Sequence, residues 1–145
     1  MKQTSLLLLF LLTLTSCYTR YPNARKILSL EKSDGRLVSL SLEEFTNKVN
    51  STSLLMLSSS ICGYCEMANE IYLEPFVKEN KVDLYYIEIN ELSPDNRTLL
   101  DTLLIEKEVI YNGVPYMFIM ENGKYINEEE DYNYFIDFIK EYTNY

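Results

Sequence analysis

Short apolar runs alternate along the chain with segments whose apolar residues recur every three or four positions. The runs at 53–58, SLLMLS, and 82–89, VDLYYIEI, are apolar on both faces and predict strands buried within a sheet. Residues 27–40 alternate apolar and polar positions around a Ser-Asp-Gly turn signal, which predicts a short hairpin or an extended lead-in.

Helical periodicity fills the spaces between these strands. Ser41 and Glu44 form a capping box that predicts a helix over about 42–49. A second helix is expected after Cys62, interrupted near Pro75 because proline breaks the helical hydrogen-bond pattern. A third is expected from Ser93 to about Glu108, with leucines along one face.

The C-terminal part predicts a hairpin followed by a helix. A strand is expected at about 115–120, a turn at 121–124, a short strand at 125–126, and a last helix that carries Tyr134 to Tyr142. The acidic run 128–131 is interpreted as a solvated start of that helix, where negative charge is favourable. Alternating strands and helices predict an α/β domain with a parallel β-α-β unit and a closing antiparallel hairpin.

The first residues follow a different pattern. Residues 1–16, MKQTSLLLLFLLTLTS, contain an apolar run that is shorter than the roughly 20 residues of a membrane-spanning helix and fits a signal peptide. The following Leu-Thr-Ser-Cys stretch resembles the bacterial lipobox, which implies a lipid on Cys17 and an extracytoplasmic protein anchored to the cell membrane or outer membrane. The expected organisation is a leader over 1–16, a lipidated cysteine with a flexible tether over 17–28, and one domain over 29–145.

Composition narrows the chemistry. Removal of the leader leaves 129 of 145 residues, enough for one domain with its own core. The formal net charge of −9 is the wrong sign for binding nucleic acid. The chain has no histidine, which excludes Ser/His and Cys/His catalytic pairs and the usual imidazole-containing zinc sites. We therefore expect no metal and no cofactor, and chemistry that needs only thiols.

The stretch SICGYCE supplies the thiols. Cys62 follows the strand that ends near Ser58 and stands at the start of a predicted helix, where backbone N–H groups stabilise a thiolate. Cys65 lies one helical turn further on, so it can close a disulfide and resolve a mixed disulfide with a substrate.

A second motif, Gly113-Val114-Pro115 followed by a strand and an Asn-Gly turn, strengthens this interpretation. Together with the cysteine pair and the element order over about 37–145, it resembles the thioredoxin family. The resemblance implies a thioredoxin fold, a central mixed β-sheet flanked by helices. It implies that Cys62 is the nucleophile, Cys65 the resolving thiol and Pro115 a cis-proline. The backbone of Val114 would pair with a substrate strand.

The implied activity is that of a membrane-tethered thiol-disulfide oxidoreductase. It would act on secreted or envelope proteins and exchange electrons with an unidentified membrane redox partner. Tyr64 and Tyr116 are expected to flank the cysteines and offer an apolar surface to an unfolded substrate.

This chain departs from cytosolic thioredoxin near the cysteines. Ile61 replaces a tryptophan, Gly-Tyr replaces Gly-Pro, and Met56 occupies the position of a buried aspartate. The last change deprives Cys65 of a nearby proton acceptor. Glu66 and Glu88 are the candidates to replace it, and Glu66 is expected at the surface. Gly-Tyr also occurs between the cysteines of bacterial disulfide isomerases, which add a dimerisation domain for which this chain has no room.

Two other functions remain compatible with these residues. The first is a non-catalytic thioredoxin-like accessory lipoprotein that assists export or maturation of a secreted peptide. The second is a Cu(I) carrier that uses the two thiolates.

Overall fold

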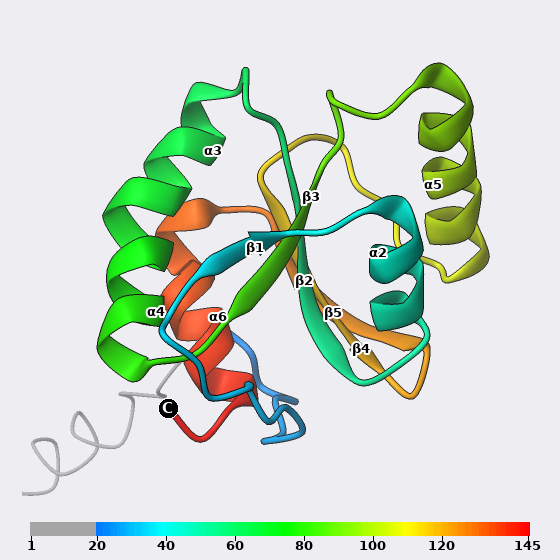
Figure 1. Cartoon of the computed structure of the whole chain (residues 1–145). Helices are drawn as coiled ribbons and strands as arrows, with labels where there is room; N and C mark the ends of the chain where they lie inside the picture. The colour runs from blue at the N-terminus through cyan, green and yellow to red at the C-terminus, as the bar shows by residue number, and fades with distance from the viewer. Residues whose placement is uncertain (1–19) are drawn as a thin grey trace, which may run out of the picture.

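The computed structural model describes residues 20–145, so the predicted leader and Cys17 lie outside the described residues. A five-stranded sheet in the order β1-β3-β2-β4-β5 forms the centre (Figure 1). β3 pairs in parallel with β1 and β2, whereas β4 is antiparallel to β2 and β5. The mixed sheet confirms the predicted parallel unit and antiparallel hairpin. The strands are β1 (Leu37–Ser39), β2 (Ser53–Ser58), β3 (Leu84–Glu88), β4 (Tyr116–Glu121) and β5 (Lys124–Glu129).

Helices cover both faces of the sheet (Figure 1). One face packs against a long helical stretch and the C-terminal helix, and we call it the α3 face; the other packs against two helices, and we call it the α5 face. The α3 face is covered by α3 (Gly63–Met67), the π-helix η1 (Ala68–Leu73), α4 (Glu74–Asn80) and α6 (Phe135–Tyr142), and the α5 face by α2 (Leu42–Val49) and α5 (Pro94–Glu106). The 3-10 helix η2 (Tyr132–Tyr134) leads into α6.

The alternation of side chains along β2 builds both halves of the core. Leu54 and Met56 point to the α3 face, while Leu55 and Leu57 point to the α5 face. Every residue of β2 is buried. A central strand of such a sheet is covered on both faces, which explains its continuous apolar sequence. The strand predicted at 53–58 is thereby confirmed.

The helical stretch that starts at Gly63 changes geometry before Pro75. The chain widens from α-helix to the π-helix η1, and Pro75 then lies in the first turn of α4, where the missing N–H is tolerated. The prediction of an interruption near this proline is confirmed. The predicted capping box is also confirmed: Ser41 and Glu44 bond reciprocally at the start of α2.

Residues 27–40 form an extended lead-in. An isolated bridge joins Lys32 to Val82, and β1 then pairs with β3. The turn between them needs Gly35, which has a φ of +83° and would bring a Cβ atom to 2.3 Å from the Val77 carbonyl oxygen. No helix within residues 20–145 is long and apolar enough to cross a membrane.

Two expectations for polar segments are wrong. β5 extends to Glu129, so Glu128 and Glu129 belong to a strand, and the Glu129 side chain is only 5% exposed because it bonds Arg20 and Tyr21. Only Asp131 acts as expected at a helix start, where it accepts from the Asn133 N–H. The described part of the tether expected over 17–28 is held on the domain: Arg20 and Tyr21 bond Glu129, and the Tyr21 and Leu28 side chains are buried in the core.

Candidate dithiol active site

The two cysteines stand where β2 leads into the helical stretch at one end of the sheet (Figure 1). Cys62 has extended backbone angles and is the N-cap residue of α3, so its Sγ accepts from the Cys65 N–H at 3.3 Å. Both cysteines are free thiols; Cys62 is half-buried and Cys65 is 1% exposed. The two thiols therefore differ in access: a large substrate reaches Cys62 first.

The Gly-Val-Pro motif lies beside the first cysteine. The Cys62 thiol donates to the Val114 carbonyl oxygen at 3.4 Å, and the Val114–Pro115 peptide bond is cis, as predicted. Residues 52 positions apart in sequence thus meet at one site. The loop before β4 presents the backbone of Val114 next to the accessible thiol.

The two tyrosines expected to flank the cysteines have different environments. Tyr64 is 62% exposed and stacks on Tyr132 with ring centroids 5.9 Å apart. Tyr116 is fully buried, and its hydroxyl donates to the Ile110 carbonyl, so the prediction that it offers substrate-binding surface is wrong. The reason is strand alternation: Tyr116 is the first residue of β4 and points to the α5 face with Phe118.

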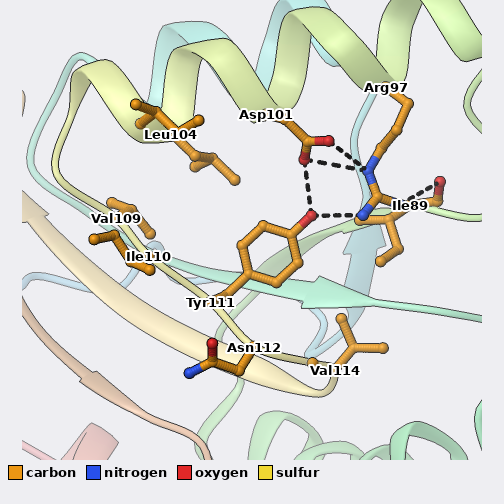
Figure 2. A pocket seen from close by; sticks show the side chains of 11 residues that line it. Ile89, Arg97, Asp101, Leu104, Val109, Ile110, Tyr111, Asn112 and Val114 are labelled. Atoms are coloured by element: carbon orange, nitrogen blue, oxygen red, sulfur yellow. Dashed lines mark hydrogen bonds and ion pairs between the residues drawn. The ribbon is translucent and has the colours of Figure 1, made fainter.

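Two hollows meet at Val114. The smaller, of about 360 Å³, lies between the Tyr64–Tyr132 stack and the cis-proline loop. The larger, of about 530 Å³, lies between α5 and the loop before β4 (Figure 2). Val114 was predicted from its motif, but neither hollow was. The smaller hollow joins three segments that are distant in the chain, and the larger forms within residues 89–114, where α5 packs beside the loop before β4. The smaller hollow is lined by Tyr64, Val114, Pro115, Glu130, Asp131 and Tyr132.

A polar network fixes one wall of the larger hollow, as Figure 2 shows. The Tyr111 hydroxyl donates to Asp101 at 2.8 Å and accepts from Arg97 at 2.6 Å, while the Arg97 Nε contacts Asp101 at 3.2 Å. These contacts tie the loop before the cis-proline to α5. Arg97 and Asp101 are paired with each other. Much of the remaining wall is apolar, with Ile89, Leu104 and Val109 among its residues.

The surroundings of Cys65 bear on its reactivity. Burial is the largest effect and raises the pKa of its thiol to about 12, and the neighbouring Cys62 adds to the rise. The Ser58 hydroxyl and the Ser59 N–H act in the opposite direction. Met56 is buried in the apolar core, as expected from its sequence position, so the thiol has no carboxylate there.

Within residues 20–145, no group of three or more His, Cys, Asp or Glu side chains is arranged to hold a metal ion. The functional groups that the described structure brings together are the two thiols, the cis-proline loop and the hollows beside it.

Known structures share this architecture. A thioredoxin from Aeropyrum pernix superposes with a TM-score of 0.56 at 17% identity, covering 80% of this chain and 97% of that one. The short form of thioredoxin f from spinach chloroplast gives 0.55 at 19%, covering 77% and 96%. Thioredoxin f2, solved in complex with ferredoxin:thioredoxin reductase, gives 0.55 at 16%, covering 74% and 96%.

These likenesses establish the fold. No protein-family model and no curated protein matches the chain in sequence. The chain has the thioredoxin fold, a single α/β domain with a mixed five-stranded sheet between helices.

Proposed function

We propose that this protein is an extracytoplasmic thiol-disulfide oxidoreductase that exchanges disulfides with secreted or envelope proteins through Cys62 and Cys65. One observation carries the proposal: the accessible Cys62 thiol caps a helix and lies 3.4 Å from the Val114 carbonyl beside a cis-proline, with the buried Cys65 one turn behind it. The likeness to thioredoxins in fold agrees with this activity.

The different burial of the thiols sets the order of events. In reduction, the Cys62 thiolate attacks a substrate disulfide, forms a mixed disulfide and releases one substrate thiolate. Cys65 then attacks the Cys62 sulfur, the bond to the substrate breaks, and the second substrate thiolate leaves. The substrate gains two electrons and the protein is left with a Cys62–Cys65 disulfide. Oxidation of a substrate dithiol is the same sequence in reverse.

The surface beside Cys62 suits a polypeptide in extended form. The backbone of Val114 can add to a substrate strand, and the two hollows receive side chains on either side of it. Ile61 and Tyr64 are exposed beside Cys62 and provide apolar contact without demanding one sequence. Protein substrates therefore fit this site.

The proposed location is outside the cytoplasm, with a lipid on Cys17 as the membrane anchor. The support is the apolar leader and the lipobox-like stretch that precede the domain. Only two residues separate Cys17 from the docked Arg20, so the domain would lie close to the bilayer. A membrane redox partner would restore the dithiol. The structure of thioredoxin f2 in complex with ferredoxin:thioredoxin reductase supports a reductase as the kind of partner.

The dithiol reduction potential tests the activity. We would equilibrate the detergent-purified protein with glutathione buffers and quantify the Cys62–Cys65 disulfide, with Cys62→Ser as the control. We expect a value between about −270 and −120 mV, the range of thiol-exchange proteins. A value below about −300 mV would identify a structural disulfide and favour a non-catalytic accessory lipoprotein.

The anchor has its own test. Labelling of growing cells with palmitate, followed by membrane fractionation, should mark the wild-type protein and retain it with membranes. Cys17→Ser should lose both label and retention, and Cys62→Ser should keep both. Equal labelling of all three would refute the lipid on Cys17.

A further inference from the structure

Several buried polar groups in the described structure have no hydrogen-bond partner. Three buried side-chain oxygens have no hydrogen-bond partner of normal geometry within the described residues, and they are Ser58 Oγ, Asn69 Oδ1 and Glu88 Oε2. Such groups cost free energy in a folded protein, so each of them calls for an explanation. Two of them, on Ser58 and Glu88, belong to adjacent strands at the end of the sheet that carries the cysteines.

Strand register places these two side chains together. Ser58 and Glu88 are directly paired residues of the parallel strands β2 and β3, so their side chains project from the same face. On β2, Ser58 follows Leu54 and Met56 on the α3 face, and on β3, Glu88 follows Leu84 there. This is the face that α3 covers with Cys65.

The Ser58 hydroxyl acts on both neighbours. It lowers the pKa of the Cys65 thiol and also that of the Glu88 carboxyl, although it forms no hydrogen bond of normal geometry with either group in this structure. Burial is the largest influence on Glu88 and leaves its pKa above the ordinary value; the nearby Glu91 adds to the rise, and the Ser60 N–H opposes it. A carboxylate with a raised pKa is a stronger base than an exposed one.

The structure assigns Glu88, acting through the Ser58 hydroxyl, as the proton acceptor for Cys65 when that thiol resolves a mixed disulfide. This inference deepens the proposed function and rests on it. Met56 leaves no acid at the middle of β2, and Glu66 on α3 is exposed to solvent. Glu88 is paired with Ser58 and keeps one buried oxygen without a partner, so it is the carboxylate that fits the role.

The step balances in protons and electrons. The Ser58 hydroxyl bonds neither group in the resting structure, so the relay requires its side chain to turn toward Cys65 and Glu88. Ser58 then accepts the proton of Cys65 and passes its own to Glu88, which becomes neutral. The Cys65 sulfur forms a bond with the Cys62 sulfur, and the bond between Cys62 and the substrate sulfur breaks. The substrate leaves as a thiolate with the electron pair of the broken bond. In the reverse direction, Glu88 returns the proton to the departing Cys65 thiolate.

A two-step chromogenic reaction isolates this event. Reduced protein mixed with dithiobis-nitrobenzoate releases one coloured thiolate when Cys62 attacks and a second when Cys65 resolves the mixed disulfide. In stopped-flow measurements across neutral pH, Glu88→Gln should slow the second release by about tenfold to a hundredfold. This is at or below the low end of the effect that a general base usually contributes. The first release should be unchanged, which also shows that the variant is folded.

A second measurement separates proton transfer from a simple electrostatic effect. The thiol pKa of Cys65, taken from thiolate absorbance in a Cys62→Ser background, should fall or stay constant in Glu88→Gln, because the variant removes a negative charge. If Cys65 attacks more slowly in Glu88→Gln although its pKa has not risen, the variant has lost a proton acceptor. A second release as fast as in wild type, or one slowed only in proportion to a raised pKa of Cys65, would overturn the inference.

Matched variants complete the design. Glu91→Gln and Glu66→Gln remove exposed charges near the site and should leave the second release unchanged. Ser58→Ala should slow it as Glu88→Gln does, whereas Ser53→Ala, at the other end of β2, should not. Because the reagent reports on Cys65 without a protein substrate, a failure here is distinct from failure of the proposed redox function.

Discussion

Glu88 and Glu129 end two strands of the same sheet, β3 and β5, which have β2 and β4 between them. The two carboxylates differ in how their burial is compensated. Glu129, the last residue of β5, accepts hydrogen bonds from Arg20, Tyr21 and the Asp131 N–H. Glu88, the last residue of β3, keeps one oxygen buried without a partner. Burial acts to raise the pKa of both, but only at Glu129 do the donors outweigh it and lower the pKa.

The difference separates a structural carboxylate from one available for chemistry. A carboxylate surrounded by donors is held as an anion and contributes stability, since charge-assisted hydrogen bonds are the strong ones. A buried carboxylate with too few donors lowers the stability of the folded protein, and proteins keep such a group where its chemistry, such as proton transfer, is needed. Here the first kind holds the N-terminal segment to the sheet edge, and the second lies behind the dithiol.

The largest expected effect comes from disrupting the satisfied carboxylate. Glu129→Gln should lower the free energy of unfolding by about 2 kcal/mol, because charged hydrogen bonds to Arg20 and Tyr21 are lost. Urea unfolding at neutral pH measures this, with the exposed Glu130→Gln as control. The pKa of Glu129 is lowered in the folded protein, so its contribution is present above the ordinary value of 4.5 and lost as pH falls through the lowered pKa. A deficit that persists unchanged at strongly acidic pH would contradict this origin.

Removal of a single donor should have about half that effect. Tyr21→Phe keeps the ring, which packs edge-on against Phe138 at 5.3 Å, but removes the hydroxyl that bonds Glu129. We expect a loss of about 1 kcal/mol in the same unfolding assay. Tyr134→Phe, on a partly exposed ring, is the matched control and should be neutral. Equal losses in both would mean that the ring, rather than the hydrogen bond, stabilises the segment.

Sequence patterns predicted the fold well because they report local rules. The buried run of β2, the capping box at Ser41 and the interruption near Pro75 each follow from periodicity or backbone chemistry within a few residues. The cysteine pair and the cis-proline were predicted because their motifs are compact. Their contact across 52 positions is a feature of the folded chain that neither local motif contains by itself.

The errors share a physical cause. Glu129 looked like a solvated acid because its partners, Arg20 and Tyr21, lie more than a hundred positions away. Tyr116 looked like surface because register, which decides the face that a strand residue occupies, is not visible in one sequence. The pairing of Ser58 with Glu88 depends on the same register. The sequence gives the charge and polarity of each side chain, but it does not give the distant residues that the side chain contacts in the fold.

Removal of the Glu88 charge should change the free energy of unfolding in the opposite direction to removal of the Glu129 charge. Glu88→Gln is expected to raise the free energy of unfolding at neutral pH by less than about 1 kcal/mol, because it removes a half-buried charge whose few donors do not offset its burial. The folded pKa of Glu88 is raised, so wild-type stability from this group is full below the ordinary value of 4.5 and is lost as pH rises through the raised pKa. The advantage of the variant should therefore vanish in acid. Unfolding midpoints at acid and neutral pH measure it, and a destabilised variant at neutral pH would show that Glu88 is held by bonds like those of Glu129.

The smallest effect is expected at Ser58, and its contrast with Ser53 makes it informative. Both serines are buried on β2, but the Ser53 hydroxyl donates to the Lys48 carbonyl at 2.7 Å, whereas Ser58 Oγ has no partner of normal geometry in the described structure. Ser53→Ala should cost about 1 kcal/mol. Ser58→Ala should change stability by less than about 0.5 kcal/mol, because no established hydrogen bond is lost. Thermal unfolding of the two variants side by side decides the point. If Ser58→Ala cost as much as Ser53→Ala, the hydroxyl would be part of the structural framework; if it costs nothing yet slows resolution by Cys65, the serine is retained for proton transfer.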